Sequence, residues 1–254
     1  MFAFLRRHPV PIEASFDYSL VLTYAFPAQV LQPLLPPGLT LDVYEGVGFV
    51  AIALVQTRAL RPAGLPRFLG RDFFLSGYRI FARYRRPSGQ LLRGLRILRS
   101  DADSRIMVGV GNALTHYHYH HCRVTSHRTA DELSLRIQTP GQEADLALRA
   151  DLASNPAAPP KGSPFPDWPA ARRFAGPLPF TFDYETASRS IVLIEGVRDH
   201  WVPRPVTVQV DTAEFLRRPP FAAARPVLAN SFYVENIAYR WRRGIVEKLP
   251  MEMV

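Results

Sequence analysis

Short stretches of β-type sequence, separated by turn signals at regular spacing, most strongly limit what this chain can fold into. They either alternate in polarity or are continuously apolar, and they are rich in β-branched and aromatic residues. The predicted strands cover residues 16–25, 39–42, 46–57, 76–85, 91–98, 133–139, 144–152, 180–185, 190–196, 206–210 and 227–241. Residues 47–55 are nearly all apolar, which predicts a central strand that is buried on both faces. We therefore expect a closed or strongly curved antiparallel sheet.

Short helices are expected beside this sheet, in a mainly β, β-rich α+β fold. Residues 26–35 contain an early proline and are followed by Pro-Pro-Gly, which stops a helix. The proline-rich connection 155–179 contains Asp167 as an N-cap, Pro169 in the first turn and Gly176 at the end. These residues predict a short helix over 167–176. Residues 106–110 are short and apolar, and no helix is assigned there. No repeat or domain break is visible, so we expect one domain over residues 1–254.

The chain is strongly basic, with a formal net charge of +9 and an isoelectric point near 10.1. Such a balance raises the question of nucleic acid binding. Among the 31 basic side chains, however, only Lys161 and Lys248 are lysines, whereas phosphate-binding surfaces usually recruit lysine as well. The sequence has no zinc-finger spacing and no aromatic RNA-binding signature. We favour a solvated basic surface, and a non-enzymatic structural or nucleic-acid-associated protein stays as an alternative.

The cellular location is inferred from three absences in the sequence. No apolar run approaches the roughly 20 residues that span a bilayer, so we expect no membrane partner. Residues 1–9 carry their charge after the short apolar part, unlike a secretory signal. Cys122 is the only cysteine, which excludes an internal disulfide. We expect a cytoplasmic protein.

Candidate chemistry is concentrated in residues 114–123, which hold four of the seven histidines and the only cysteine. Read as a strand, this segment places two sets of side chains on opposite faces. One set is His116, His118, His120 and Cys122, and the other is Tyr117, Tyr119, His121 and Arg123.

Three interpretations of this segment stay open. The side chains can be hydrogen-bonded parts of a sheet, or they can act on an organic ligand in a cavity. The third is a metal site made by His116, His118 and His120, since His-x-His spacing on a strand puts two imidazoles about 6.5–7 Å apart. No carboxylate in the segment supports a metal, and no cofactor is expected.

Several motifs resemble the acetoacetate decarboxylase superfamily, and most closely its uncharacterised bacterial members. The opening match is residues 18–24 followed by 34–42 (LLPPGLTLD), and the order continues through 77–84, 109–117 and 200–216. The resemblance extends from about Phe16 to Tyr239. It implies a closed, cone-like β-barrel with a central cavity and a few peripheral short helices. It also implies that a homo-oligomer is possible.

The departures from the family pattern bear on the reaction. The decarboxylases use tandem lysines, one of which forms a Schiff base with the substrate ketone, where this chain has His116 and Tyr117. The family's arginine before the first motif corresponds to Phe16, and its catalytic glutamate has no clear counterpart between Leu75 and Tyr78. The resemblance therefore implies the fold, whereas we expect Schiff-base decarboxylation to be absent.

The resulting hypothesis is a cavity that binds a small organic acid or a similar metabolite. His116 and Tyr117 are the catalytic candidates, because histidine can shuttle protons near neutral pH and tyrosine can donate to an oxygen. His118, Arg79 and Arg83 are the ligand-binding candidates, the arginines as partners of a carboxylate. For both arginines we favour a solvated outer face over this role. Whether any reaction is catalysed stays open.

Overall fold

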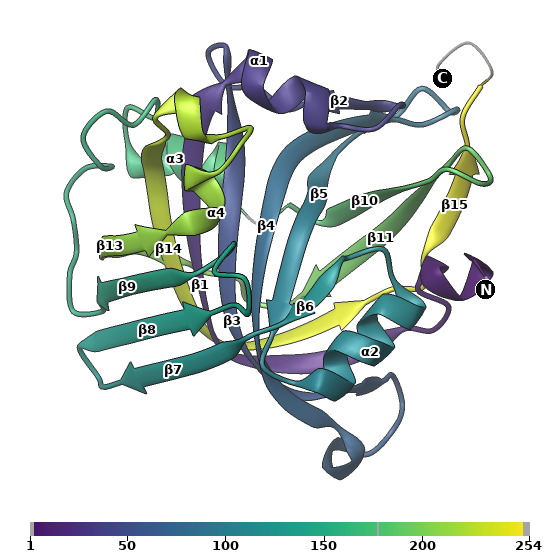
Figure 1. Ribbon diagram of the computed structural model, residues 1–254, viewed down its shortest axis with the longest axis horizontal. Coiled ribbons are helices and arrows are strands. Elements are labelled where there is room, and N and C mark those ends of the chain that lie inside the picture. Colours follow the sequence, from purple (N-terminus) through teal and green to yellow (C-terminus); the bar gives the residue numbers. More distant parts are fainter. Residues whose placement is uncertain (1–2, 177, 251–254) are drawn as a thin grey trace.

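The computed structural model describes residues 3–176 and 178–250, and its strands form two sheets (Figure 1). Met1 and Phe2 of the N-terminal segment, and Pro177 of the proline-rich connection, lie outside the described residues. The larger sheet contains β1 (Ile12–Pro27), β2 (Leu39–Leu41), β3 (Val47–Pro62), β4 (Arg71–Arg85), β5 (Leu91–Ala102), β6 (Tyr119–His121), β10 (Phe180–Glu185), β11 (Ser190–Arg198), β12 (Arg204–Pro205), β14 (Val227–Trp241) and β15 (Ile245–Lys248). The smaller sheet contains β7 (Arg123–Arg128), β8 (Glu132–Gln138), β9 (Leu146–Asp151) and β13 (Thr207–Ala213).

Seven strands of the larger sheet close into a ring. Their order is β14, β1, β3, β4, β5, β10 and β11, and β11 pairs back with β14. Neighbours in the ring are antiparallel except β5 and β10, which run parallel. A parallel pair needs a long connection, and here the chain passes through a helix, the smaller sheet and the proline-rich segment before it returns. The prediction of a mainly β fold with a closed, largely antiparallel sheet is confirmed.

Short helices lie around the sheets. They are α1 (Ala28–Leu31), α2 (Arg105–Leu114), α3 (Trp168–Ala175) and α4 (Glu214–Arg217), with 3-10 turns η1 (Ala3–Arg7), η2 (Gln32–Leu34), η3 (Arg67–Leu69) and η4 (Ala222–Ala224). The predicted α3 is confirmed, and Asp167 caps it by accepting from the backbone N–H of Ala170 at 2.6 Å. Helix α2 was not predicted. No helix within the described ranges is long and apolar enough to cross a bilayer.

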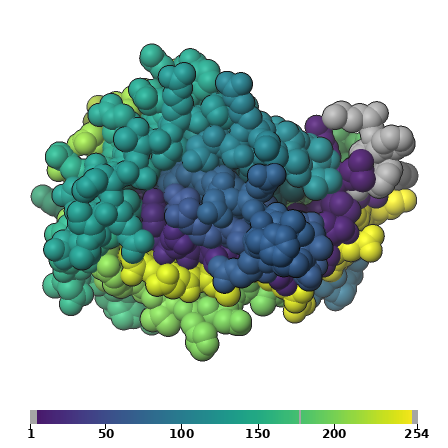
Figure 2. All heavy atoms as spheres, turned by 90° about the horizontal axis from the view of Figure 1, so that it is seen from below, coloured from purple at the N-terminus to yellow at the C-terminus, as the bar shows by residue number. Residues whose placement is uncertain are grey.

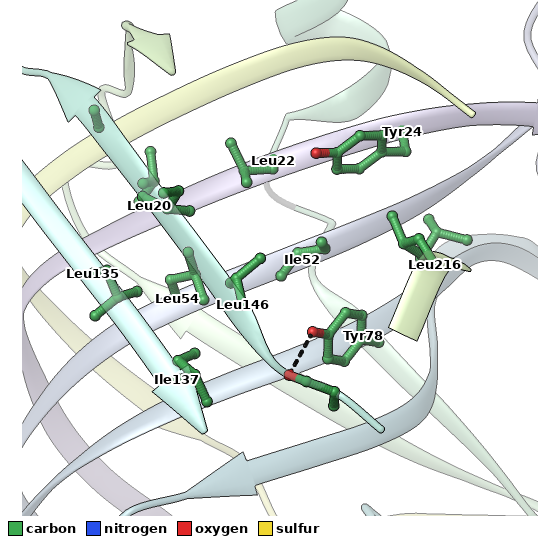
Figure 3. Close-up of a cluster of buried hydrophobic side chains, with 14 of the residues drawn as sticks. Leu20, Leu22, Tyr24, Ile52, Leu54, Tyr78, Leu135, Ile137, Leu146 and Leu216 are labelled. Atoms are coloured by element: carbon green, nitrogen blue, oxygen red, sulfur yellow. Dashed lines mark hydrogen bonds between the residues drawn. The ribbon is translucent and has the colours of Figure 1, made fainter. Parts of the chain in front are cut away.

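Alternation along β1, β3 and β4 gives the larger sheet two apolar faces with different partners. The outward face packs against the smaller sheet in one shared core (Figure 3). This core includes Leu20, Leu22, Ile52, Leu54 and Tyr78 from the larger sheet and Leu135, Ile137 and Leu146 from the smaller one. The inward face looks into the ring. Residues 47–55 are therefore apolar throughout because both faces of β3 are covered, as predicted.

Candidate functional site

The ring encloses a cavity of about 190 Å³ that is lined mainly by apolar side chains. Strand β1 contributes Ser19 and Val21, whose neighbour Leu20 points outward into the core between the sheets. Strand β3 contributes Ala51 and Ala53. The small side chains at these inward positions leave the volume that larger residues would fill, so the cavity follows from the sequence of the inward face.

Arg79 of β4 brings a positive charge into this apolar cavity. Its Nε atom is buried and has no hydrogen-bond partner, and the guanidinium forms no ion pair with any described carboxylate. Gly77 makes room for it, because a Cβ atom there would lie 3.1 Å from the Arg79 Nε. Burial lowers the pKa of Arg79, and the nearby phenol groups of Tyr239 and Tyr119 oppose this shift. An arginine nevertheless stays charged in proteins, so the cavity holds an uncompensated cation.

Two tyrosines beside Arg79 supply neutral hydrogen-bond donors. Tyr117 and Tyr119 both line the cavity, and their ring centroids are 6.2 Å apart. Burial raises the pKa of Tyr119 to about 12 and raises that of Tyr117 well above its usual value. Both phenols are therefore protonated at neutral pH. The hydroxyl of Tyr117 is buried without a hydrogen-bond partner, so it is free to donate to a ligand.

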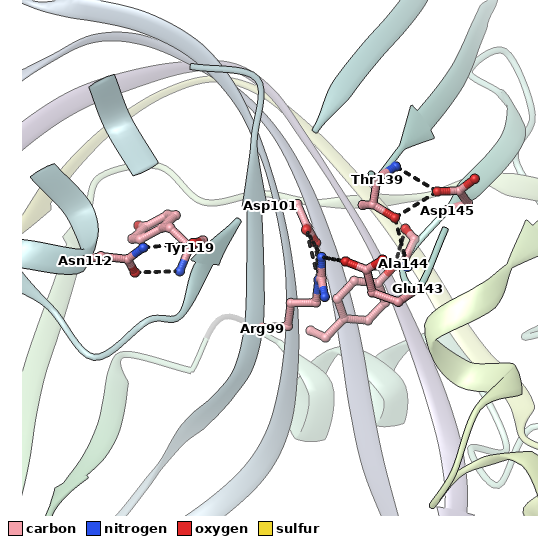
Figure 4. Close-up of polar contacts among 9 residues, drawn as sticks. Arg99, Asp101, Asn112, Tyr119, Thr139, Glu143, Ala144 and Asp145 are labelled. Carbon is pink, nitrogen blue, oxygen red and sulfur yellow. Dashed lines mark hydrogen bonds and ion pairs between the residues drawn. The ribbon is translucent and has the colours of Figure 1, made fainter. Parts of the chain in front are cut away.

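Helix α2 holds Tyr119 in place. The Asn112 side chain donates to the Tyr119 carbonyl and accepts from its N–H, each at 2.8 Å (Figure 4). The Asn112 side chain thus makes the two hydrogen bonds that a neighbouring strand would otherwise make with Tyr119. Gly111 packs directly against the ring, since a Cβ atom there would lie 2.5 Å from Tyr119 Cδ2. The position of Tyr119 depends on these two helical residues.

A second arginine lies among aromatic rings of the cavity wall. The Arg198 guanidinium donates to the Tyr239 hydroxyl at 3.2 Å and lies 5.2 Å from the centroid of the Trp201 ring. Phe16 stacks on Tyr239 with centroids 4.9 Å apart. Arg198 also has no carboxylate partner among the described residues. The cavity therefore offers two cations and, among its lining residues, no acidic side chain.

A titratable carboxyl group lies inside the ring next to the cavity. Asp183 is buried two residues after Thr181, which lines the cavity, and on the same face of β10. Arg96 pairs with one of its oxygens, and the other oxygen has no partner. Burial raises the pKa of Asp183 to about 7, and the charge of Arg96 opposes the rise. Asp183 therefore changes charge near neutral pH, and its negative charge raises the pKa of Tyr117.

The reading of residues 114–124 as one continuous strand is wrong. Helix α2 extends to Leu114, only β6 is a strand, and His118 between these two elements has a φ of 53°, so the backbone is not continuously extended. Tyr117 and Tyr119 line the cavity, whereas His116 does not. The grouping of Tyr117 with Tyr119, on the face opposite His116, agrees with the period-two expectation, which had left open which set of side chains faces the cavity.

The histidines do not form a common ligand set. His118 and His120 are exposed, and His116 is half-buried with an unpartnered Nε2. Burial and the charge of Arg6 lower the pKa of His116, and Glu185 opposes them. Within the part of the chain that the structure describes, no group of three His, Cys, Asp or Glu residues could hold a metal. His116, His118 and His120 therefore do not form the metal site that the alternative interpretation assumed.

Cys122 is not a reactive thiol in this arrangement. It is buried, and burial raises its pKa to about 12, so the thiolate is not populated at neutral pH.

The two arginine candidates have different surroundings. Arg79 faces the cavity as described above. Arg83 instead donates from its Nε to Asp42, a fully buried carboxylate that also accepts from Arg93 at 2.6 Å. Arg83 lies four residues after Arg79, on the same face but near the end of β4, where it joins β2 to β5 through this carboxylate. Arg83 is therefore a structural ion-pair residue and not a lining residue.

Sequence reasoning missed Arg198, Tyr239 and His8 as lining residues. Tyr239 lies on a correctly predicted strand, but Asn236 has a φ of 54° and stands unpaired opposite Asp17, so the strand changes phase before Tyr239. A left-handed residue inside a strand has no clear signature in a single sequence. Arg198 lies just beyond the predicted end of its strand, which was placed at residue 196.

Comparison with known proteins identifies the family of this chain. A family model described as an uncharacterised conserved protein, DUF2071, matches residues 13–235. The chain belongs to this family. No curated protein matches it.

Solved structures with the same fold are acetoacetate decarboxylases and related enzymes. Acetoacetate decarboxylase from Legionella pneumophila is 13% identical, with a TM-score of 0.63 over 94% of this chain and 87% of the other. The enduracididine biosynthesis enzyme MppR in complex with pyruvate is 11% identical, with a TM-score of 0.60 over 94% and 90%. An acetoacetate decarboxylase-like enzyme from Sphingomonas wittichii RW1 is 14% identical, with a TM-score of 0.57 over 97% and 94%. At these identities the likeness establishes the fold alone, and it agrees with the resemblance read from the sequence.

Proposed function

We propose that this DUF2071 protein binds a small organic acid with an apolar body inside its ring of strands. The observation that carries the proposal is Arg79, a cation that faces an apolar cavity without any carboxylate partner among the described residues. A buried charge without a partner is costly, and a bound carboxylate supplies that partner through charge-assisted hydrogen bonds.

The rest of the lining fits the same ligand. Tyr117 can donate to a second oxygen of the ligand, and Arg198 can contact an additional anionic group. The apolar side chains of β1, β3 and β4 contact the remaining carbon atoms. The complex of MppR with pyruvate shows that a related fold accommodates a small oxo acid. His116 and His118 lie outside the lining and have no role in this proposal.

The proposal does not include imine chemistry. Schiff-base formation requires an amine next to the ligand, and neither Lys161 nor Lys248, both exposed, lines the cavity. Treatment with borohydride in the presence of acetoacetate or pyruvate should leave the protein mass unchanged. A lysine adduct would overturn this part of the proposal and leave the binding of an acid intact.

Titration calorimetry tests the binding itself. We expect monocarboxylates with short apolar chains to bind and the matching primary amides to bind at least tenfold more weakly, because only the acid pairs with Arg79. Arg79→Met should weaken acid binding by about 100-fold, the order expected when one partner of a desolvated charge pair is removed. Arg85→Met is the matched control, since Arg85 is an exposed residue at the far end of the same strand. Equal affinity for acid and amide, or full affinity in Arg79→Met, would contradict the proposal.

A further inference from the structure

One end of the larger sheet gathers several exposed apolar side chains. Strand register defines this end, because Ile12 at the start of β1 pairs with Pro62 at the end of β3 and with Trp241 at the end of β14. The loop 63–70 joins β3 to β4 there, and α2 begins three residues after β5 ends beside Leu75. Figure 1 places this loop and α2 at the lower end of the molecule, and the loop stands out in the view from below in Figure 2.

We define the apolar rim as the exposed large hydrophobic residues at this end. Phe68, at the centre of η3, is 83% exposed, the highest exposure among the large hydrophobic side chains of the described residues. The full set is Val10, Leu65, Phe68, Leu69, Ile106 and Val110. Val10 and Val110 also line the cavity, so the rim and the cavity form one continuous apolar surface.

The unpaired charges around the rim are mainly basic. Arg67, Arg71 and Arg105 are exposed, and none has a carboxylate partner among the described residues. Two acidic side chains lie nearby: Asp72 binds Arg58 and the backbone of Ala59, and Asp103 accepts from the backbone N–H of Phe74 and has no basic partner among the described residues. Exposed apolar side chains surrounded by unpaired arginines are typical of a surface that binds an anionic interface.

We propose that the apolar rim docks the protein on an anionic lipid surface, with Phe68 and Leu69 entering the interface and the arginines contacting lipid phosphates. A second copy of this chain fits less well, because a two-fold contact would bring the unpaired arginines against each other. Continuity of the rim with the cavity favours a lipid surface over an acidic protein, because an amphiphilic acid can then pass between the two apolar environments.

This docking differs from the expectation of no membrane partner. That expectation depended on the absence of a spanning segment, and a peripheral contact needs only exposed apolar side chains and basic residues at one face. The identity of the acid that passes through the rim depends on the proposed function, whereas the docking itself does not. Arg79→Met should therefore bind vesicles like the wild-type protein, which separates failure of one proposal from failure of the other.

Vesicle co-sedimentation tests the docking. The wild-type protein should bind phosphatidylglycerol/phosphatidylcholine vesicles and show little binding to phosphatidylcholine alone, and binding should decrease with added salt. Phe68→Ser should weaken binding about tenfold through the lost apolar contact. Arg67→Gln combined with Arg71→Gln should weaken it about 30-fold, given roughly fivefold for each arginine near an anionic surface.

The double variant Arg85→Gln/Leu91→Ser is the matched control. It removes one exposed arginine and one exposed apolar residue at the opposite end of β4 and β5, and it should bind vesicles like the wild-type protein. The proposal is overturned if the protein does not bind anionic vesicles, or if the control loses as much binding as the rim variants. Self-association that Phe68→Ser abolishes, without vesicle binding, would assign the rim to a second copy instead.

Discussion

At the scale of single residues, the cavity is defined by groups that lack partners. Arg79 Nε, the Tyr117 hydroxyl and one oxygen of Asp183 are all buried without a hydrogen bond. Buried polar groups in proteins are nearly always paired, and the proposed acid would supply partners for Arg79 Nε and the Tyr117 hydroxyl. Among these groups, leaving Arg79 without a partner costs the most free energy, because Arg79 is charged.

His8 gives a pH-dependent prediction at the same scale. It lines the cavity, and burial lowers its pKa to about 4. The unfolded chain therefore takes up a proton near pH 6.5 that the folded protein takes up only near pH 4. The free energy of unfolding should fall as the pH drops through this window, by up to about 3 kcal/mol from this residue, and should be independent of His8 above it.

Comparison with His8→Asn isolates this contribution. His8 has a φ of 53°, a conformation that asparagine tolerates better than most residues. Urea unfolding of both proteins at several pH values should show a stability difference that changes only between the two pKa values. A constant difference across the window would mean that His8 does not titrate in this way.

At the scale of elements, α2 determines which aromatic side chains reach the cavity. Its inward positions Met107, Gly111 and Leu114 line the cavity, and Asn112 binds the backbone of Tyr119. Ser104 starts the helix by accepting from the backbone N–H of Met107 at 3.3 Å.

Two glycines in α2 provide a matched pair of substitutions. Gly111→Ala should destabilise the protein and weaken acid binding, because the added Cβ would lie 2.5 Å from the Tyr119 ring. Gly109→Ala should stabilise it by about 0.5–1 kcal/mol, since no atom lies within 4 Å of the new Cβ and alanine has the higher helix propensity. Chemical denaturation together with acid titration measures both effects. Similar behaviour of the two variants would show that Gly111 does not position Tyr119.

At the scale of the whole molecule, the two sheets share one core. Leu135 of the smaller sheet is buried beside Leu20 and Leu54 of the ring. Arg99 of β5 adds a polar link, because it binds Asp101 and also reaches Glu143 in the loop between β8 and β9 at 2.8 Å (Figure 4). The shared core is the physical basis for expecting the sheets to unfold together.

Leu135→Ala tests this cooperativity. It should lower the free energy of unfolding by about 2–5 kcal/mol, as deletions of buried leucine side chains do. All three tryptophans lie outside the smaller sheet, so their fluorescence reports the ring, whereas circular dichroism reports both sheets. The two signals should shift together. If circular dichroism shifts and fluorescence does not, the sheets unfold separately; the exposed Leu91→Ala is the control and should change little.

The sequence by itself determined the β-rich fold, most strand positions and the capped helix α3, because these depend on local alternation, turn residues and a capping side chain. It also placed Arg79 on the face of β4 opposite Tyr78, but favoured a solvated outer face for this arginine, whereas the closed ring turns that face toward the cavity. Tertiary structure decided that Tyr117 and Tyr119 face the cavity and His116 does not, that Arg83 is held by Asp42, and that Arg198 and Tyr239 join the wall. The reason is physical: which of two alternating faces points inward, and which partner distant in sequence a side chain meets, have no local signal. These features arise only when the ring closes.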